Sequence, residues 1–307
     1  HNNHLNGGKC PVCKEKEMFA YADKPWVLIC GRMNKCGAKI HIKDIYDDLF
    51  NDWSDTYVAT PKNPNAAADA YLSMARGFKT DLIKGWYTQG TYRQPSTHIY
   101  SATVKVELSC GATFQRLIDR PERFGKGEKA RIFGKFGGEW WSAPTGKFSK
   151  LTTAGELWIN EGIFNAMAMM HVGKFAVSSM TSGNYPEKAL AELAKQCAAE
   201  GVNRPVLVFA LDSDKAGRDF TLKHVERAEA SGWTCKVAQV PVSGGTAKVR
   251  DWNDFYQTGE LTDDFLEEAF YHGELLTAKS AYNKAELIHA HNGWGSFNFD
   301  YKNQLYW

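Results

Sequence analysis

The sequence predicts an α/β protein: an N-terminal β-ribbon, a basic α+β region, and then an α/β domain with a mainly parallel sheet. Three observations predict this fold class. Four cysteines cluster in the first 36 residues, glycine-separated strand-like runs fill residues 98–150, and strands alternate with helices after residue 151. Such alternation with apolar strands is typical of parallel sheets that helices cover on both faces.

The 307 residues have room for several domains. We expect a ribbon over residues 1–60, a basic region over 61–150, the α/β domain over 151–260, and a helical segment over 261–307 that begins a C-terminal region. Residues 1–150 hold 23 Lys and Arg against 15 Asp and Glu, whereas residues 151–307 hold 14 against 20. A basic half suits a polyanion and an acidic half suits metal ions, although chance asymmetry is the alternative.

Composition excludes several classes. No stretch approaches about 18 consecutive apolar residues, so we expect no membrane-spanning helix and no membrane partner. The polar N-terminus lacks the apolar core of a secretory signal. Seven cysteines, four of them clustered, fit a reducing cytoplasm and a metal site better than a disulfide framework.

The clustered cysteines have the spacing of a metal site. Cys10 and Cys13 are followed, after sixteen residues, by Cys30 and Cys36. Two thiolate pairs at this distance can close a tetrahedral Zn²⁺ site around a hairpin. The five-residue gap in the second pair is longer than usual, so His41 is an alternative to Cys36, which we prefer. Four unrelated buried cysteines are the structural alternative.

The ribbon also carries cations and three aromatic residues, Phe19, Tyr21 and Trp26. Cations neutralise phosphates, and aromatic faces stack on unpaired bases. We therefore expect the ribbon to bind single-stranded nucleic acid, unless the aromatic side chains simply form its core. The cations are Lys9, Lys14, Lys16, Lys24, Arg32, Lys35 and Lys39.

The middle of the chain is predicted to contain a linker, then a helix, and then a mainly β region. Residues 44–53 look helical, and two prolines within residues 61–64 mark a linker. An alanine-rich helix is expected over residues 66–76, with Gly77 ending it. Residues 98–150 then predict a compact, mainly β region in which basic side chains gather.

After residue 151 the pattern predicts a parallel sheet. Strands are expected at residues 157–159, 175–177, 205–211 and 234–240. Helices are expected at residues 162–171, 186–199 and 215–231. In open α/β sheets, functional groups gather at the carboxyl ends of the strands.

Two acidic motifs follow predicted strands. Glu161 precedes Gly162 after the first strand, and Asp212 and Asp214 follow the most apolar strand. Carboxylates that share a cleft repel each other, and Mg²⁺ or Mn²⁺ relieves that repulsion with hard oxygen ligands. Such ions stabilise the attacking and leaving oxygens of phosphoryl transfer. Either motif alone is weak, but the two together in this order are considerably more specific.

These motifs resemble the TOPRIM fold of primases, topoisomerases and related nucleases, over roughly residues 154–258. Residues 182–184 (Ser-Gly-Asn) lie where such domains have a small-residue loop. Residues 251–254 (Asp-Trp-Asn-Asp) are similar to a late acidic element of primases. The resemblance makes Asp251 a further candidate metal ligand, and a helix N-cap is its alternative role.

The order of the parts resembles bacterial-type DNA primases. Residues 71–78, with Arg76-Gly77-Phe78, are similar to the helix end that opens the primase catalytic core. Residues 114–119 and 135–141 look most like primases of plasmids, phages and integrative elements. The ribbon departs from the usual pattern, because it has four cysteines where those ribbons have a histidine among the ligands.

The resemblance implies primer synthesis on single-stranded DNA by metal-dependent nucleotidyl transfer from nucleoside triphosphates. Glu161 would act as general base or metal ligand, beside Asp212 and Asp214. The basic region would face the TOPRIM cleft, or it would form only a flexible charged loop. A replicative helicase, or a fused helicase-like region after Trp307, is an expected partner. The candidate template- and nucleotide-binding residues are Arg116, Arg120, Arg131, Lys135, Lys215 and Arg218.

Three other functions fit the sequence less well. A type IA topoisomerase needs a nucleophilic Tyr in a large further domain, for which the chain after Glu260 is too short. A TOPRIM nuclease would not need the ribbon, and a non-catalytic single-stranded DNA-binding module would not need the acidic set. The chain has no P-loop. The end, residues 296–307, reads as a hairpin cut in its second strand, so we expect a fragment of a longer protein.

Overall fold

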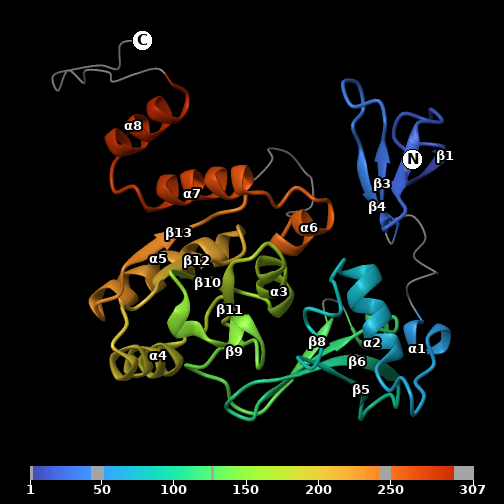
Figure 1. Ribbon diagram of the computed structural model, residues 1–307, viewed down its shortest axis with the longest axis horizontal. Helices are drawn as coiled ribbons and strands as arrows, with labels where there is room; N and C mark the ends of the chain where they lie inside the picture. Colours follow the sequence, from blue (N-terminus) through green and yellow to red (C-terminus); the bar gives the residue numbers. More distant parts are fainter. Residues whose placement is uncertain (1–2, 43–51, 126–127, 242–249, 294–307) are drawn as a thin grey trace.

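The computed structural model describes residues 3–42, 52–125, 128–241 and 250–293. The described chain contains three β-sheets, and Figure 1 shows the ribbon, the β5–β8 sheet and the β9–β13 sheet in different parts of the molecule. The β5–β8 region and the C-terminal domain share one hydrophobic core. The predicted helix at residues 44–53 lies almost entirely outside the described residues, as does the predicted C-terminal hairpin. No helix in the described ranges is long and apolar enough to cross a membrane.

The ribbon is a four-stranded antiparallel sheet in the order β1-β2-β3-β4. Its strands are β1 His4–Gly8, β2 Met18–Tyr21, β3 Lys24–Cys30 and β4 Lys39–His41. Its small core consists of Cys10, Met18 and Cys30, with further cysteines and aliphatic residues packed around them. None of the three aromatic residues noted in the sequence belongs to that core, so the core alternative for them is wrong.

The middle region combines short helices with an antiparallel sheet in the order β5-β6-β7-β8. Its strands are β5 Thr88–Arg93, β6 Tyr100–Glu107, β7 Thr113–Leu117 and β8 Ala130–Phe133. Before the sheet lie α1 Trp53–Thr56 and α2 Ala66–Ala70, and α2 continues as a π-helical turn over Tyr71–Ala75.

The alanine-rich helix predicted over residues 66–76 is therefore present, but only its first half is α-helical and its second half is a π-helical turn. π-Helical turns widen a helix locally and are frequent at functional sites. Gly77 follows with φ +70°, and an added Cβ would lie 3.3 Å from the Trp26 indole nitrogen of the ribbon. Glycine is thus required here both by the backbone conformation and by the close approach of another part of the chain.

The C-terminal sheet has the order β13-β12-β10-β11-β9. Its strands are β9 Trp141–Ser142, β10 Glu156–Asn160, β11 Phe175–Ser178, β12 Val206–Ala210 and β13 Cys235–Val237. All pairs except β11–β9 are parallel, which confirms the predicted mainly parallel sheet. The edge strand β9 comes from the glycine-rich stretch that precedes residue 150.

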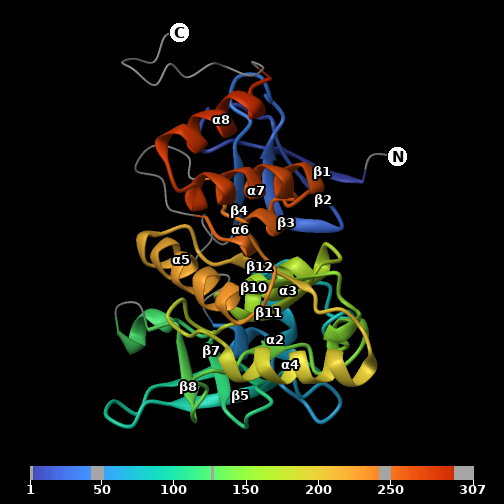
Figure 2. The ribbon, with the colours of Figure 1, turned by 90° about the vertical axis from the view of Figure 1, so that its left-hand side faces the viewer.

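Helices cover both faces of this sheet. They are α3 Ile163–His171, α4 Glu187–Glu200, α5 Lys215–Ala230, α6 Trp252–Gln257 and α7 Asp263–Thr277. A last helix, α8 Ala281–His291, packs on α7 and has no buried residue. Figure 1 shows α4 and α5 to the left of the strands and α3 to their right, and Figure 2 looks onto the α4 and α5 side.

Successive side chains along each strand point to opposite faces of the sheet and join different cores. Trp158 and Val208 join the core with α3, α6 and α7, whereas Ile159 and Phe209 join the core with α4 and α5. A strand with apolar side chains on both faces can only be a central strand of a covered sheet, which explains the apolar runs in the sequence. This arrangement places the loops after β10 and β12 next to each other.

The ribbon contacts the C-terminal domain near the end of α6 (Figure 1). Lys39 Nζ on β4 lies 3.4 Å from Glu260 Oε1, and Glu260 Oε2 accepts a 2.9 Å hydrogen bond from Arg250. Both ion pairs are partly exposed, so each contributes little to stability, and only the Lys39–Glu260 pair joins the ribbon to the domain.

Candidate active site and zinc site

The ribbon brings four cysteine sulfurs together. The Sγ atoms of Cys10, Cys13, Cys30 and Cys36 all lie within 4.8 Å of one another. The Cys10–Cys36 distance is 3.9 Å and the Cys13–Cys30 distance is 3.7 Å. A Zn–S bond of about 2.3 Å gives tetrahedron edges of about 3.8 Å, whereas a disulfide needs about 2.05 Å. The set fits Zn²⁺, and it includes Cys36 where His41 was the alternative.

The thiols of this set compete for ionisation in the absence of a cation. The amide N–H of Cys13 lowers the pKa of Cys10 to about 7. At Cys30 the amide of Arg32 acts in the same direction, but burial and the neighbouring sulfurs outweigh it and raise the pKa to about 12. One thiolate thus forms readily and the next is opposed, which is the situation that a bound cation resolves.

The two acidic motifs meet at the carboxyl ends of β10 and β12. These strands are adjacent and parallel, and Asn160 pairs with Ala210 at their last positions. The amide of Asn160 also donates a 3.3 Å hydrogen bond to the carbonyl of Ala210. Glu161 and Asp212 follow within two residues of this pair, so the sheet places the two carboxylates side by side.

Asp212 is the centre of the negative charge. Burial, followed by the carboxylates of Glu161, Asp251, Asp214 and Asp254, raises its pKa to about 7. Burial also raises the pKa of Glu161, against the amides of Ser182 and Asp212, which stabilise its charged form. An acidic group with a perturbed pKa at a strand end is a marker of a functional site.

Two of the predicted ligands also cap helices. Asp214 is the N-cap of α5 and accepts a 2.7 Å hydrogen bond from the Gly217 amide. Asp251 is the N-cap of α6 and forms a capping box with Asp254. The alternative role proposed for Asp251 is therefore real, and its charge nevertheless acts on Asp212.

Gly217 is required by the way α5 starts. A Cβ at this position would lie 1.9 Å from the backbone oxygen of Asp212. The helix therefore runs back over the Asp212–Asp214 loop at a distance that only glycine permits.

A buried amide network holds Asp212, and sequence reasoning missed it. Asn165 on α3 donates a 3.1 Å hydrogen bond to Asp212 Oδ1, and its own oxygen accepts from the backbone amide of Asn253 at 3.1 Å. Asn253 is fully buried and its Oδ1 accepts from Arg76 and Gln257, each at 3.2 Å. The only signal in the sequence was the asparagine within the Asp-Trp-Asn-Asp element.

Two guanidinium groups lie near the carboxylates. Arg76, at the end of the π-helical turn, bonds to the Tyr71 hydroxyl at 2.9 and 3.0 Å. Burial lowers its pKa, but Tyr71, Asp251 and Asp254 outweigh this effect and raise it. Burial and the neighbouring charge of Arg76 lower the pKa of Arg116, whose buried Nε has no hydrogen-bond partner in the described chain. The structure thus brings Arg116 to the acidic site and adds Arg76, which was noted only as part of a helix end.

Lys135 lies in an open pocket beside this site. The pocket has a volume of about 560 Å³ and is lined by Lys135, Lys188, Thr181 and Asn184, among others. Thr181 and Gly183 flank Ser182, whose amide bonds to the Glu161 carboxylate. Two lysines at the rim suit phosphate groups.

The remaining predicted cations are placed less directly. Arg120 pairs with Asp52, and Arg131 pairs with Glu128 and stacks on Tyr92. Lys215 is exposed in the first turn of α5, and Arg218 donates to the carbonyl of Ser213. The structure therefore places Lys215 and Arg218 on the helix that Asp214 caps, while local acids already engage Arg120 and Arg131.

The carboxylate set fits a hard divalent cation that keeps open positions. Within the described ranges, the four cysteines are the only group of three or more His, Cys, Asp or Glu whose ligand atoms all lie within 4.8 Å of one another, so the carboxylates form a looser group than a closed cage. Mg²⁺ is usually held by one or two carboxylates together with water and substrate phosphates. Burial first, and then the neighbouring carboxylates, raise the pKa of Asp212, and a bound cation would offset both effects.

Comparison with known proteins bears on the C-terminal domain. Residues 158–256 match the family model described as Toprim-like. This segment is a Toprim-like domain. The match confirms the TOPRIM prediction, which covered residues 154–258 on the strength of Glu161, Asp212 and Asp214. No curated protein sequence matches the chain.

Solved structures show similarity over more of the chain. The RNA polymerase domain of the Mycobacterium tuberculosis primase DnaG is 14% identical, with 82% of this chain and 97% of that chain covered and a TM-score of 0.49. The zinc-binding and RNA polymerase domains of the Aquifex aeolicus primase are 12% identical, covering 95% and 91% with a TM-score of 0.37. The same Mycobacterium domain in complex with double-stranded DNA is 16% identical, covering 75% and 81% with a TM-score of 0.42.

Proposed function

We propose that this chain synthesises short primers on single-stranded DNA, as the zinc-ribbon and catalytic parts of a DNA primase. The observation that carries the proposal is the carboxylate group at the ends of β10 and β12, where the pKa of Asp212 is raised to about 7. The four-sulfur site in a ribbon that contacts the same domain supports a primase over a Toprim-like nuclease, which would not need a ribbon.

The reaction would be nucleotidyl transfer. The 3′-hydroxyl oxygen of one nucleotide forms a bond to the α-phosphorus of the next triphosphate, while the bond from that phosphorus to the bridging oxygen breaks and pyrophosphate leaves. Glu161 would accept the hydroxyl proton, because its raised pKa brings its basicity closer to neutral pH. Asn165 and Asn253 would hold Asp212 in place.

Asp212, Asp214 and Asp251 would hold Mg²⁺ or Mn²⁺. The cation would bind phosphate oxygens and stabilise the charge that develops during transfer. Arg76 and Arg116 would face the phosphates with fixed positive charge, and the unpartnered Nε of Arg116 is a donor ready for an anion. Lys135 and Lys188 would bind the outer phosphates in the adjoining pocket.

The test is primer synthesis on single-stranded DNA with labelled ribonucleotides and Mg²⁺ or Mn²⁺. Wild type is compared with Asp212→Ala and with Glu200→Ala, a control that removes an exposed carboxylate at the end of α4. We expect short products from wild type and the control, and a loss of about a thousandfold in Asp212→Ala.

The alternatives give different results. Degradation of the DNA in an Asp212-dependent manner, without primers, would establish a nuclease. Tight DNA binding with neither reaction would establish a non-catalytic binding module. Primers that persist in Asp212→Ala would remove the carboxylate group from the mechanism.

A further inference from the structure

The hydroxyl group of Tyr71 lies beside the two guanidinium groups near the carboxylates, and the reaction proposed above assigns no task to it. Its oxygen accepts hydrogen bonds from Arg76 Nε at 3.0 Å and from Arg76 Nη2 at 2.9 Å. Arginine ordinarily presents this pair of N–H groups to a carboxylate or a phosphate. Tyr71 is 7% exposed, so little water competes for these bonds.

The π-helical turn brings Tyr71 and Arg76 onto the same face of the helix. Side chains that are three or four residues apart are neighbours on an α-helix. Tyr71 and Arg76 are five residues apart, and a π-helical turn has its hydrogen bonds between residues five apart. The contact between the hydroxyl and the guanidinium therefore depends on the widened turn.

Arg116, on β7, approaches the same hydroxyl from the β5–β8 sheet. Burial lowers the pKa of Arg116, whereas the Tyr71 oxygen raises it. The charge of Arg76 lowers this pKa again, so the two guanidinium groups lie close enough to repel each other. Both side chains are half-buried, and an acceptor oxygen that they share offsets their repulsion.

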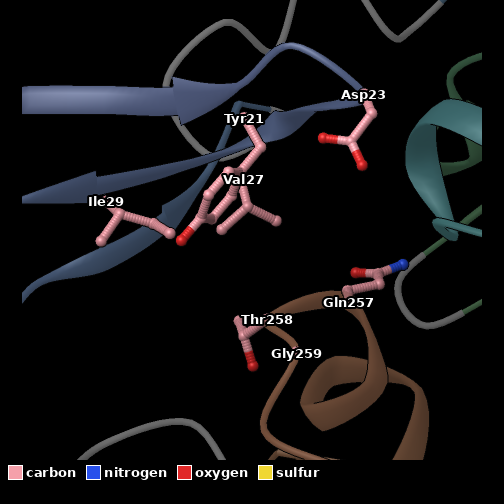
Figure 3. A pocket seen from close by; sticks show the side chains of 7 residues that line it. All are labelled: Tyr21, Asp23, Val27, Ile29, Gln257, Thr258 and Gly259. Atoms are coloured by element: carbon pink, nitrogen blue, oxygen red, sulfur yellow. The ribbon is translucent and has the colours of Figure 1, made fainter. Parts of the chain in front are cut away.

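The rest of Arg76 is held by other groups. Its Nη1 donates to Asn253 Oδ1 at 3.2 Å, and its guanidinium carbon lies 4.7 Å from the centre of the Phe164 ring. Asn253 Oδ1 also accepts from Gln257, which lines a pocket of about 270 Å³ between the ribbon and α6 (Figure 3). All three nitrogens of the Arg76 guanidinium thus have protein partners, which fix its position before substrate arrives.

We infer that Tyr71 is a positioning residue whose hydroxyl holds the guanidinium groups of Arg76 and Arg116 at one fixed spacing for the phosphates of a triphosphate or of pyrophosphate. A fixed spacing raises the affinity, because binding does not have to order the two side chains or bring like charges together. The inference rests on the proposed function, which assigns both arginines to phosphate. It adds the residue that sets their geometry.

Tyr71 also packs in an aromatic cluster, and that cluster supplies a matched control. The Tyr71 ring makes an edge contact with Trp53 at 5.6 Å between ring centroids. Tyr57 stacks on the same Trp53 at 5.9 Å, and its hydroxyl donates to the sulfur of Met74 at 3.2 Å. Tyr57→Phe therefore removes a hydroxyl from the same cluster, but one that bonds to a sulfur and not to an arginine.

The first measurement is the affinity for inorganic pyrophosphate with Mg²⁺, by isothermal titration calorimetry on the zinc-loaded full chain. We expect Tyr71→Phe to bind pyrophosphate about tenfold more weakly than wild type, the effect of losing hydrogen bonds to a charged group. Tyr57→Phe should match wild type. Equal affinities in wild type and Tyr71→Phe, or no binding of pyrophosphate by wild type, would overturn the inference.

Primer synthesis by the same proteins is the second measurement. Tyr71→Phe should raise the KM for nucleoside triphosphate about tenfold and change kcat little, because phosphate binding is weakened. A purely structural role would instead lower kcat at an unchanged KM, since fewer molecules would be folded, and urea unfolding would show the lost stability. That pattern would overturn the inference.

A double variant tests whether Tyr71 acts through the arginines. Arg116→Gln alone should weaken pyrophosphate binding. Adding Tyr71→Phe to it should change the affinity by less than about threefold, because the like charge that the hydroxyl offsets is then gone. A full tenfold effect of Tyr71→Phe in the Arg116→Gln background would overturn the inference.

The two measurements fail in different ways. Pyrophosphate binding that depends on Tyr71, in a protein that makes no primers, would remove the proposed function and leave the positioning role of Tyr71. Primers made with the same KM by wild type and Tyr71→Phe would remove that role and leave the proposed function.

Discussion

The sulfurs of the ribbon lie within 4.8 Å of one another, whereas the carboxylates around Asp212 form a looser group on three different segments. The cysteine set is complete by itself, because four thiolates fill a tetrahedral zinc site. The carboxylate set carries excess negative charge and leaves room for water and phosphate oxygens. This difference supports the proposal that the four-sulfur site stabilises the fold and that the carboxylate group binds a cation together with substrate.

The largest expected effect comes from removing one cysteine of the four-sulfur site. Cys30→Ser should abolish zinc binding and unfold the ribbon, since a structural zinc contributes about 10 kcal/mol to folding. Zinc released on denaturation and amide hydrogen exchange measure the outcome. The parallel sheet should keep its protection, and Cys110→Ser, an exposed cysteine outside the set, should keep its zinc. Stoichiometric zinc in Cys30→Ser would refute the four-sulfur site.

A smaller effect is expected at Gly217, where α5 packs closely on the Asp212–Asp214 loop of the carboxylate group. Gly217→Ala should destabilise the protein by about 3 kcal/mol, because its Cβ would lie 1.9 Å from the Asp212 backbone oxygen. Urea unfolding measures the change. Gly155→Ala is the matched control, since nothing lies within 4 Å of a Cβ at that position. Equal stability of the two variants would show that the loop can move away.

The carboxylate group around Asp212 should also make the free energy of unfolding depend on pH. The pKa of Asp212 is about 7 in the folded protein against an ordinary value of 3.8, so the folded state binds this proton more tightly. The contribution is therefore fully present below about pH 4 and is lost as pH rises to about 7. Without Mg²⁺ or Mn²⁺, Asp212→Asn should be more stable than wild type by about 2 kcal/mol at pH 8.

Urea unfolding at pH 5 and pH 8 checks this sign. Asp264→Asn, which neutralises an exposed carboxylate in the first turn of α7, should follow the wild-type profile. Added Mg²⁺ should reduce the difference between wild type and Asp212→Asn, because the cation replaces the proton. An Asp212→Asn profile parallel to wild type would contradict the excess of charge.

The smallest effect is expected at the Lys135 pocket beside the carboxylate group. Lys135→Ala should raise the KM for nucleoside triphosphate about fivefold in primer synthesis, with little change in kcat, because one exposed charge contact to phosphate is lost. Lys150→Ala removes another exposed lysine and serves as the control. A fall in kcat alone would place Lys135 in the chemical step and not in binding.

Much of the C-terminal domain could be predicted from the sequence. The apolar runs at Leu157–Ile159 and Val206–Ala210 identify central strands, because only a sheet covered on both faces buries every side chain. Glu161 and Asp212 follow from the rule that functional groups gather at the ends of such strands. Asn165 could not be found this way, since a buried helix residue has no local pattern that marks it.

The middle region shows the same limit. The alanine-rich pattern predicts a helix, but its second half adopts a π-helical turn that directs Arg76 toward Tyr71 and Asn253. Helix propensity does not distinguish the two hydrogen-bond patterns, because it reflects the side chain and not its distant partners. The bond between Arg76 and Asn253 joins residues 177 positions apart.

The sequence by itself therefore determined the strands and helices of the Toprim-like domain, the cysteine spacing and the carboxylates at the strand ends, because periodicity and motif spacing are local properties of a chain. Only the tertiary structure decided that Arg116 lies near Asp251, that Asn165 and Asn253 hold Asp212, and that the ribbon and α6 enclose a pocket. Those features depend on which distant side chains pack together, and packing is set by the whole fold.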